Sequence, residues 1–181
     1  MSTTTQVRRY AIDPAHTAAH FSVRHLMISK VRGTFGKISG SLELPADSAI
    51  PASVAVTIDA ASIETREPQR DTHLRSADFL DVENFPELKF TSTAVRPIDA
   101  TTFEVTGNLE IHGTARPTTI KVEVSGQGPD PWGNYRVAYE AAFKLSRKDF
   151  GLVWNQALEA GGVAVGDEID ITLDVEAVPA A

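Results

Sequence analysis

The histidines have the most versatile side-chain chemistry in this sequence, because imidazole acts as a metal ligand and as a general acid or base near neutral pH. His16 and His20 lie four positions apart. On a β-strand this spacing keeps them on one face but about 13 Å apart, too far to share a metal ion. No His-Glu-x-x-His motif is present. Histidines of different strands can still meet, so a metal-dependent enzyme using His16, His25, His73 and His112 stays an alternative hypothesis.

A second polar group lies in residues 67–80, whose sequence is EPQRDTHLRSADFL. Its apolar residues have helical spacing, which predicts one short helical segment. An enzyme would use Asp71 and His73 as an acid–base pair, but residues two apart on a helix do not face each other. We therefore favour a structural role, with Asp71 stabilising the start of the helix and the arginines binding local carbonyl or carboxylate groups.

Other catalytic signatures are absent from the sequence. There is no Gly-x-Ser-x-Gly elbow, no Gly-x-Gly-x-x-Gly loop and no phosphate-binding loop. The chain has no cysteine, which excludes disulfides, thiolate metal sites and cysteine nucleophiles. A net charge of −7 without a basic run argues against nucleic acid as a partner. The sequence thus predicts no catalytic residue, no metal and no cofactor.

The elements that must position these side chains are β-strands. Apolar and polar residues alternate with period two along most of the chain, as in strands that have one dry and one solvated face. Unbroken apolar runs, typical of buried parallel strands, do not occur, so the predicted sheet is antiparallel. The clearest alternating segments are residues 53–58, 103–112, 119–124, 135–145 and 169–176.

Turn residues separate these segments and indicate roughly eight strands, the first long one near residues 16–27. One helix cannot cover such a sheet, so the sheet must form a sandwich or close into a barrel, and the pattern alone allows both. We expect a single domain over residues 1–181, a mobile loop at 155–167 and a frayed tail at 177–181.

The start of the chain, residues 1–10, is polar, and no apolar run approaches the length of about 20 residues that a membrane span needs. We therefore expect a soluble, cytoplasmic protein without a transmembrane segment.

An ordered series of motifs resembles the YceI-like family over residues 10–178. The most specific block is the RDxHLRSxDFL stretch that starts at Arg70. The shorter motifs follow in the expected order: Tyr10-x-x-Asp13-x-x-His16, Phe21-x-Val23-x-His25-Leu26, Gly33-Thr34-Phe35, Ile58-Asp59, Ser62-Ile63-x-Thr65, Phe85-Pro86, Phe90-Thr91-Ser92, Gly107-x-Leu109-x-Ile111-His112-Gly113, Asp130-Pro131-Trp132-Gly133 and Arg147-x-x-Phe150-Gly151.

The resemblance implies a mainly β fold, an eight-stranded antiparallel lipocalin-like barrel with the helical segment of residues 67–80 set against it. It also implies non-enzymatic binding, transport or storage of a long-chain amphiphile, such as a polyisoprenoid or an isoprenoid quinone, inside the barrel. Many relatives carry a secretory signal, and we expect none in this chain. Where the family often has Ser after the first motif histidine, this chain has Thr17.

Because a long apolar tail gains about 0.8 kcal/mol per methylene removed from water, a dry tube can bind it without reactive groups. His25, Arg147 and Tyr139 are candidates for contacts to a polar head group. An interaction module with a solid core is the competing hypothesis, and a homodimer is compatible with an elongated barrel. The predicted ligand-binding residues are Phe21, Val23, His25, Leu42, Val54, Val56, Ile58, Phe90, Phe103, Val105, Ile120, Val122, Tyr139, Phe143, Trp154, Leu173 and Val175.

Overall fold

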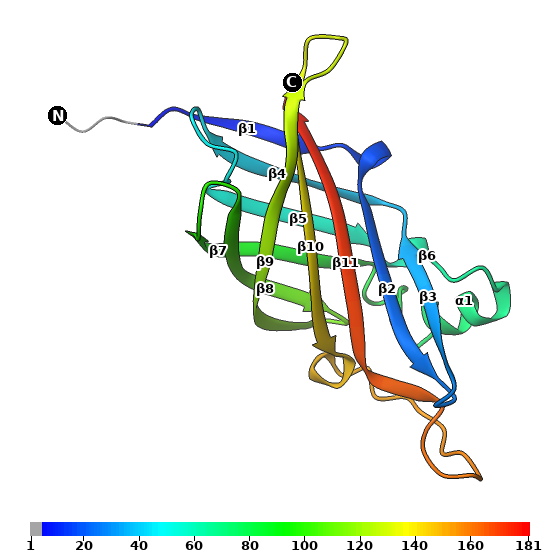
Figure 1. Ribbon diagram of the computed structural model, residues 1–181. Helices are drawn as coiled ribbons and strands as arrows, with labels where there is room; N and C mark the ends of the chain where they lie inside the picture. Colours follow the sequence, from blue (N-terminus) through cyan, green and yellow to red (C-terminus); the bar gives the residue numbers. More distant parts are fainter. Residues whose placement is uncertain (1–4) are drawn as a thin grey trace.

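The computed structural model describes residues 5–181, and long antiparallel strands account for most of them (Figure 1). One short helix, α1 (Pro68–Arg75), is the only α-helix within the described range. The strands are β1 (Val7–Ile12), β2 (Ala18–His25), β3 (Ser29–Phe35), β4 (Ile38–Pro45), β5 (Ser53–Asp59), β6 (Ile63–Glu64), β7 (Glu87–Pro97), β8 (Thr102–Ile111), β9 (Thr114–Pro129), β10 (Tyr135–Ser146) and β11 (Val165–Pro179).

The sheet closes on itself, which decides between the sandwich and the barrel. Its strand order is β1-β4-β5-β7-β8-β9-β10-β11, and β11 pairs with β1 to complete a ring of eight strands. The seam joins Tyr10 to Pro179 and Ile12 to Ala177. The predicted eight-stranded antiparallel barrel is therefore confirmed.

Strands β1 and β2 both pair with β11, and β2 corresponds to the long strand predicted near residues 16–27. A 3₁₀ turn, Pro14–His16, separates β1 from β2, and Asp13 caps this turn by accepting a 3.0 Å hydrogen bond from the Ala15 amide. Beyond the bend, β2 continues along β11 and also pairs with β3, which in turn pairs with the short β6. The strands β2, β3 and β6 thus extend the barrel at the end where α1 lies (Figure 1).

Helix α1 is shorter than the predicted segment of residues 67–80. It begins with Pro68 in its first turn, and the Glu67 carboxylate accepts a 2.7 Å hydrogen bond from the Arg70 amide. It ends at Arg75, and residues 76–80 continue as turns. Asp71 is buried and accepts hydrogen bonds from the amide and the hydroxyl of Thr65. These two bonds join the helix to Thr65, which follows β6 in the connection between the two elements.

The carboxyl terminus differs from the prediction of a frayed tail. Strand β11 continues to Pro179, and Ala177 is completely buried between β1 and β10. The small side chains of this segment do not indicate disorder, because they lie at the seam, where Ile12 and Val137 pack closely on both sides. Strand β11 also begins at Val165, inside the region predicted as a loop.

Candidate ligand cavity

The barrel encloses a cavity of about 170 Å³ whose wall is almost entirely apolar. It exists because the inward-facing residues of successive strands leave the centre unfilled, whereas most protein interiors pack to crystal density. Tyr139, Ala141 and Phe143 show the alternation that builds the wall: they face inward on β10, while Ala142 is exposed on the outer surface.

Most of the predicted ligand-binding residues surround this cavity. Their role in binding stays a prediction, but the structure does bring their side chains together on one inner surface. The residues placed there are Phe21, Leu42, Val54, Val56, Ile58, Phe90, Phe103, Val105, Ile120, Val122, Tyr139, Phe143, Leu173 and Val175.

Phe21 lies over Gly33, its direct partner on the neighbouring strand β3. A Cβ atom at position 33 would overlap the Phe21 ring, so only glycine leaves the ring this place. The ring also packs against Phe35, with 5.8 Å between the two centroids. The glycine of the Gly33-Thr34-Phe35 motif therefore shapes the cavity wall.

Three predicted ligand-binding residues lie elsewhere. Val23 is half-buried on β2, opposite Val31 and Ile169, in the part of the sheet that extends past the ring. His25 ends β2 beside the turn to β3. Trp154 packs edge-on against His73, with 4.7 Å between the ring centroids, and this contact fixes α1 against the segment after β10.

Sequence reasoning missed several residues of the wall. Ile171 belongs to the same alternating row as Leu173 and Val175, so its parity was a usable signal. Pro51 had no such signal, because it lies in the β4–β5 connection and reaches the cavity only through the path of that loop. Other missed wall residues include Ile12, Ala18, Phe35, Ile38, Leu109, Ile111, Ala141 and Leu145.

The β4–β5 loop, residues 46–52, lies over one end of the cavity, where Pro51 contributes to the wall. Ile50 is buried in the core cluster, and the hydroxyl of Tyr139 donates a 2.6 Å hydrogen bond to the carbonyl of Ala49. Burial raises the pKa of Tyr139, so its hydroxyl stays protonated and remains a donor. Tyr139 was a candidate for contacting a head group, but its hydroxyl group is hydrogen-bonded to the loop.

At the other end a second apolar cluster, in which Ile63, Leu80, Ile111 and Phe150 are buried, adjoins the cavity through Ile111. Arg147, another head-group candidate, fixes the chain beside this cluster and is absent from the cavity wall. Only 2% of its surface is exposed. Its guanidinium donates hydrogen bonds to the carbonyls of Leu152, Trp154, Val165 and Gly166, at 2.7 to 3.3 Å.

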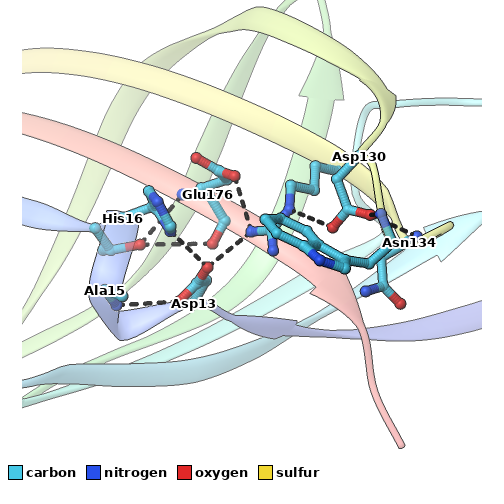
Figure 2. Close-up of polar contacts among 9 residues, drawn as sticks. Asp13, Ala15, His16, Asp130, Asn134 and Glu176 are labelled. Carbon is cyan, nitrogen blue, oxygen red and sulfur yellow. Dashed lines mark hydrogen bonds and ion pairs between the residues drawn. The ribbon is translucent and has the colours of Figure 1, made fainter.

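A polar cluster joins the bend between β1 and β2 to strand β11 on the outside of the barrel (Figure 2). Asp13, His16 and Glu176 are the one group of three or more potential metal ligands that lie within reach of each other in residues 5–181. Arg136 already binds two of them, at 2.7 Å from Asp13 and 3.0 Å from Glu176. A guanidinium thus supplies the positive charge that a metal ion would bring, which favours a structural interpretation.

The same cluster lowers the pKa of the Asp13 carboxyl group. The hydrogen bond from Arg136, and then the one from His16, hold the pKa of Asp13 at about 2, below its usual range. A third carboxylate, Asp130, binds Arg136 at 2.9 Å and accepts hydrogen bonds from the amides of the β9–β10 turn. Arg136 therefore links this turn to the bend between β1 and β2.

The structure does not bring the histidines of the metalloenzyme hypothesis together. Within residues 5–181 the single potential ligand group contains one histidine, His16. His73 binds Asp78 at 2.8 Å, and His112 packs against Phe85, with 4.8 Å between ring centroids. Asp71 is bound to Thr65, so it forms no acid–base pair with His73.

Fold and cavity together define a class of protein: an eight-stranded barrel of lipocalin type around an apolar interior. The family model described as the YceI-like domain matches residues 10–177, and the chain belongs to this family. A UPF0312 protein of Azotobacter vinelandii is 36% identical over 171 residues, which are 93% of this chain and 86% of the relative.

Two proteins of known structure share the fold. The Burkholderia cenocepacia protein BcnA is 23% identical, with a TM-score of 0.77, and the match covers 91% of this chain and 98% of BcnA. A polyisoprenoid binding domain from Saccharophagus degradans is 13% identical, with a TM-score of 0.67 and coverage of 94% and 98%. In residues 5–181, no helix has the length and apolar character needed to cross a bilayer.

Proposed function

We propose that this protein is a non-enzymatic binding protein that carries or stores an isoprenoid lipid or quinone, with the apolar tail of the ligand inside the barrel. The observation that carries the proposal is the apolar cavity of about 170 Å³ at the centre of the barrel. Interaction modules with a solid core do not need such a space, which costs dispersion contacts along its wall. The polyisoprenoid-binding character of the Saccharophagus degradans domain, which shares this fold, supports the choice of ligand class.

The size of the cavity bears on how the ligand enters. At about 170 Å³ it is close to an engineered cavity of about 150 Å³ that binds benzene. It therefore accommodates about one isoprene unit without rearrangement. A longer tail requires the side chains of the wall to move, and each further five-carbon unit gains about 4 kcal/mol by leaving water.

The two ends of the barrel differ in how firmly they are closed. The Arg147 bonds and the Phe150 cluster fix one end, whereas the loop of residues 46–52 is held over the other by Ile50 and the bond from Tyr139 to Ala49. We propose that the ligand enters under this loop and that its head group stays near it, outside the barrel. The location of the protein, its oligomeric state and the lipid's identity stay predictions.

Extraction of gently purified protein with organic solvent, followed by mass spectrometry, tests the proposal. We expect a co-purifying amphiphile with an isoprenoid tail. We also expect isoprenoid alcohols to raise the melting temperature, because a ligand that binds the folded state stabilises it. Absence of both results would contradict the proposal. A stoichiometric bound metal, together with loss of an enzymatic activity when a chelator removes it, would instead favour the metalloenzyme alternative.

A further inference from the structure

The turn between β2 and β3 exposes three consecutive large apolar side chains. Ile28 is 83% exposed, Met27 53% and Leu26 40%. This hairpin tip, residues 26–28, projects from the end of the barrel opposite the β9–β10 hairpin (Figure 1). Isolated exposed apolar residues are normal, but a contiguous projecting group is typical of an interaction site.

The backbone of the tip is unfavourable for the residues it contains. Leu26 and Met27 have φ angles of 53° and 60°, and the Ile28 amide donates a 3.1 Å hydrogen bond to the carbonyl of His25. Positive φ at both central residues is the geometry of a type I′ turn, which strongly prefers Asn-Gly or Asp-Gly. The tip thus has large apolar side chains at two positions where they cost conformational energy, and such outliers cluster at functional sites.

A neighbouring loop widens the apolar surface. The Leu26 amide donates a 2.9 Å hydrogen bond to the carbonyl of Ala164, and Met27 packs where Gly162 has no side chain. Val163, which lies between these two contact residues in the chain, is itself 37% exposed. The tip and this loop therefore form one surface at the end of the barrel.

Basic residues surround the tip on the outer face of β2 and β3. Arg24 pairs directly with Lys30, and Arg32 lies one step further along the same face, all three exposed. Lys30 has a 3.4 Å contact with the half-buried Asp170, whereas Arg24 and Arg32 form no ion pair with any residue from 5 to 181. Residues 24–32 contain no acidic residue, although the whole chain has a net charge of −7.

The distance between the apolar tip and the basic residues matches the depth of the head-group region of a bilayer. Arg24 precedes Met27 by three residues, roughly 10 Å along an extended strand. Apolar side chains of interfacial proteins lie about 5–10 Å deep, at the boundary between head groups and acyl chains. With the tip at that depth, the arginines lie at the level of the lipid phosphates.

We propose that this end of the barrel docks on a bilayer containing anionic lipid, with residues 26–28 inserted between head groups and with Arg24, Lys30 and Arg32 on the phosphates. Charge complementarity selects this occupant, since the apolar tip is flanked by three basic residues, of which Arg24 and Arg32 form no ion pair with any residue from 5 to 181. The inference goes beyond the proposed function, because a protein that binds a lipid inside its barrel need not contact a membrane.

Sedimentation with vesicles tests the proposal, using full-length protein and no barrel ligand. We expect binding to phosphatidylcholine vesicles that contain phosphatidylglycerol, much weaker binding to phosphatidylcholine alone, and loss of binding at high salt. Because no isoprenoid is present, failure here leaves the extraction experiment for the barrel unaffected.

Two variants separate the apolar and the charged contributions. Leu26→Asn combined with Met27→Gly gives the turn its preferred residues, so the variant should melt at a higher temperature yet bind the anionic vesicles at least tenfold more weakly. Arg24→Gln combined with Arg32→Gln should weaken that binding roughly tenfold or more and leave binding to neutral vesicles unchanged.

Matched controls lie at the opposite end of the barrel. Ile98→Ser removes an exposed apolar side chain from the β7–β8 turn, and Arg8→Gln combined with Arg9→Gln removes two exposed charges from β1. Both should bind vesicles like the wild type. Absence of binding of the wild-type protein to anionic vesicles would overturn the proposal. So would a concentration-dependent dimer that the Asn-Gly variant abolishes, because the tip would then bind a second copy of this chain.

Discussion

The hydroxyl of Tyr139, on the inner wall of the barrel, donates a 2.6 Å hydrogen bond to the carbonyl of Ala49, in the loop that covers one end. This contact links the cavity wall directly to the closing loop. The ring of Tyr139 is 3% exposed and packs edge-on against Phe103, so the hydroxyl has a fixed direction. Removing this bond therefore frees the closing loop while the aromatic ring at position 139 stays in the cavity wall.

Replacing Tyr139 with Phe should loosen the loop of residues 46–52. The Ala49 carbonyl loses its donor, which costs about 1–3 kcal/mol where no water replaces it. We expect a lower melting temperature and faster exchange of an isoprenoid alcohol, measured by stopped-flow displacement of a fluorescent probe. Tyr135→Phe is the control, since Tyr135 is on the same strand but exposed. Equal exchange rates in both variants would contradict entry under this loop.

Filling the cavity should abolish ligand binding and leave the fold intact. Ala141→Leu adds three carbon atoms at a position on the wall, and a cavity of about 170 Å³ has room for them. We expect titration calorimetry with farnesol to show binding to the wild type and none to the variant. Ala142→Leu places the same side chain on the outer face of the same strand and should bind normally. An unchanged affinity in Ala141→Leu would place the ligand elsewhere.

Arg147 should matter far more for stability than its single charge suggests. Lys in its place cannot reach the four carbonyls that the guanidinium binds, so we expect Arg147→Lys to lose on the order of 3 kcal/mol. Hydrogen exchange should rise in residues 152–166, where those carbonyls lie. Arg116→Lys, at an exposed arginine that binds the Asp149 carbonyl, should have little effect. Similar losses in both variants would contradict a special role for Arg147.

The cluster of Asp13 and Arg136 should make stability depend on acid pH. Because the pKa of Asp13 is about 2 in the folded protein, below that of an unfolded chain, its carboxylate stabilises the fold at neutral pH. This contribution is lost as the pH falls from about 4 to 2. Asp13→Asn should therefore melt below the wild type at pH 7, with the difference vanishing near pH 2. Asp174→Asn, at an exposed position on β11, should show no such convergence.

The period-two alternation was sufficient to predict strands over residues 53–58, 103–112, 119–124, 135–145 and 169–176, because it depends only on which face each side chain occupies. It did not predict β1 or the short β6. It could not predict closure of the barrel. The seam joins Ile12 to Ala177, residues at opposite ends of the chain, and their pairing depends on the twist and tilt of every strand between them. The sequence therefore predicts a frayed tail for residues 177–181, because the pairing of Ala177 with Ile12 at the seam has no local signal.

Residues of the candidate site could be predicted where the alternation along a strand alone decides which side chains face the cavity. Leu173 and Val175 lie on the cavity wall because they share a face with their neighbours on β11. Trp154 and Arg147 follow no alternation, and only the packing of α1 and the path of the chain after β10 decide where they lie. The volume of the cavity depends on how opposite walls pack, which no local pattern encodes.

A crystal structure of the protein grown with saturating farnesol tests the central claim most directly. We expect electron density for the isoprenoid chain between Val56, Phe103 and Leu173, with the hydroxyl end toward the loop of residues 46–52 and rotated side chains along the wall. An unchanged cavity without ligand density, or farnesol bound only on the outer surface, would contradict the claim that the barrel interior is the binding site.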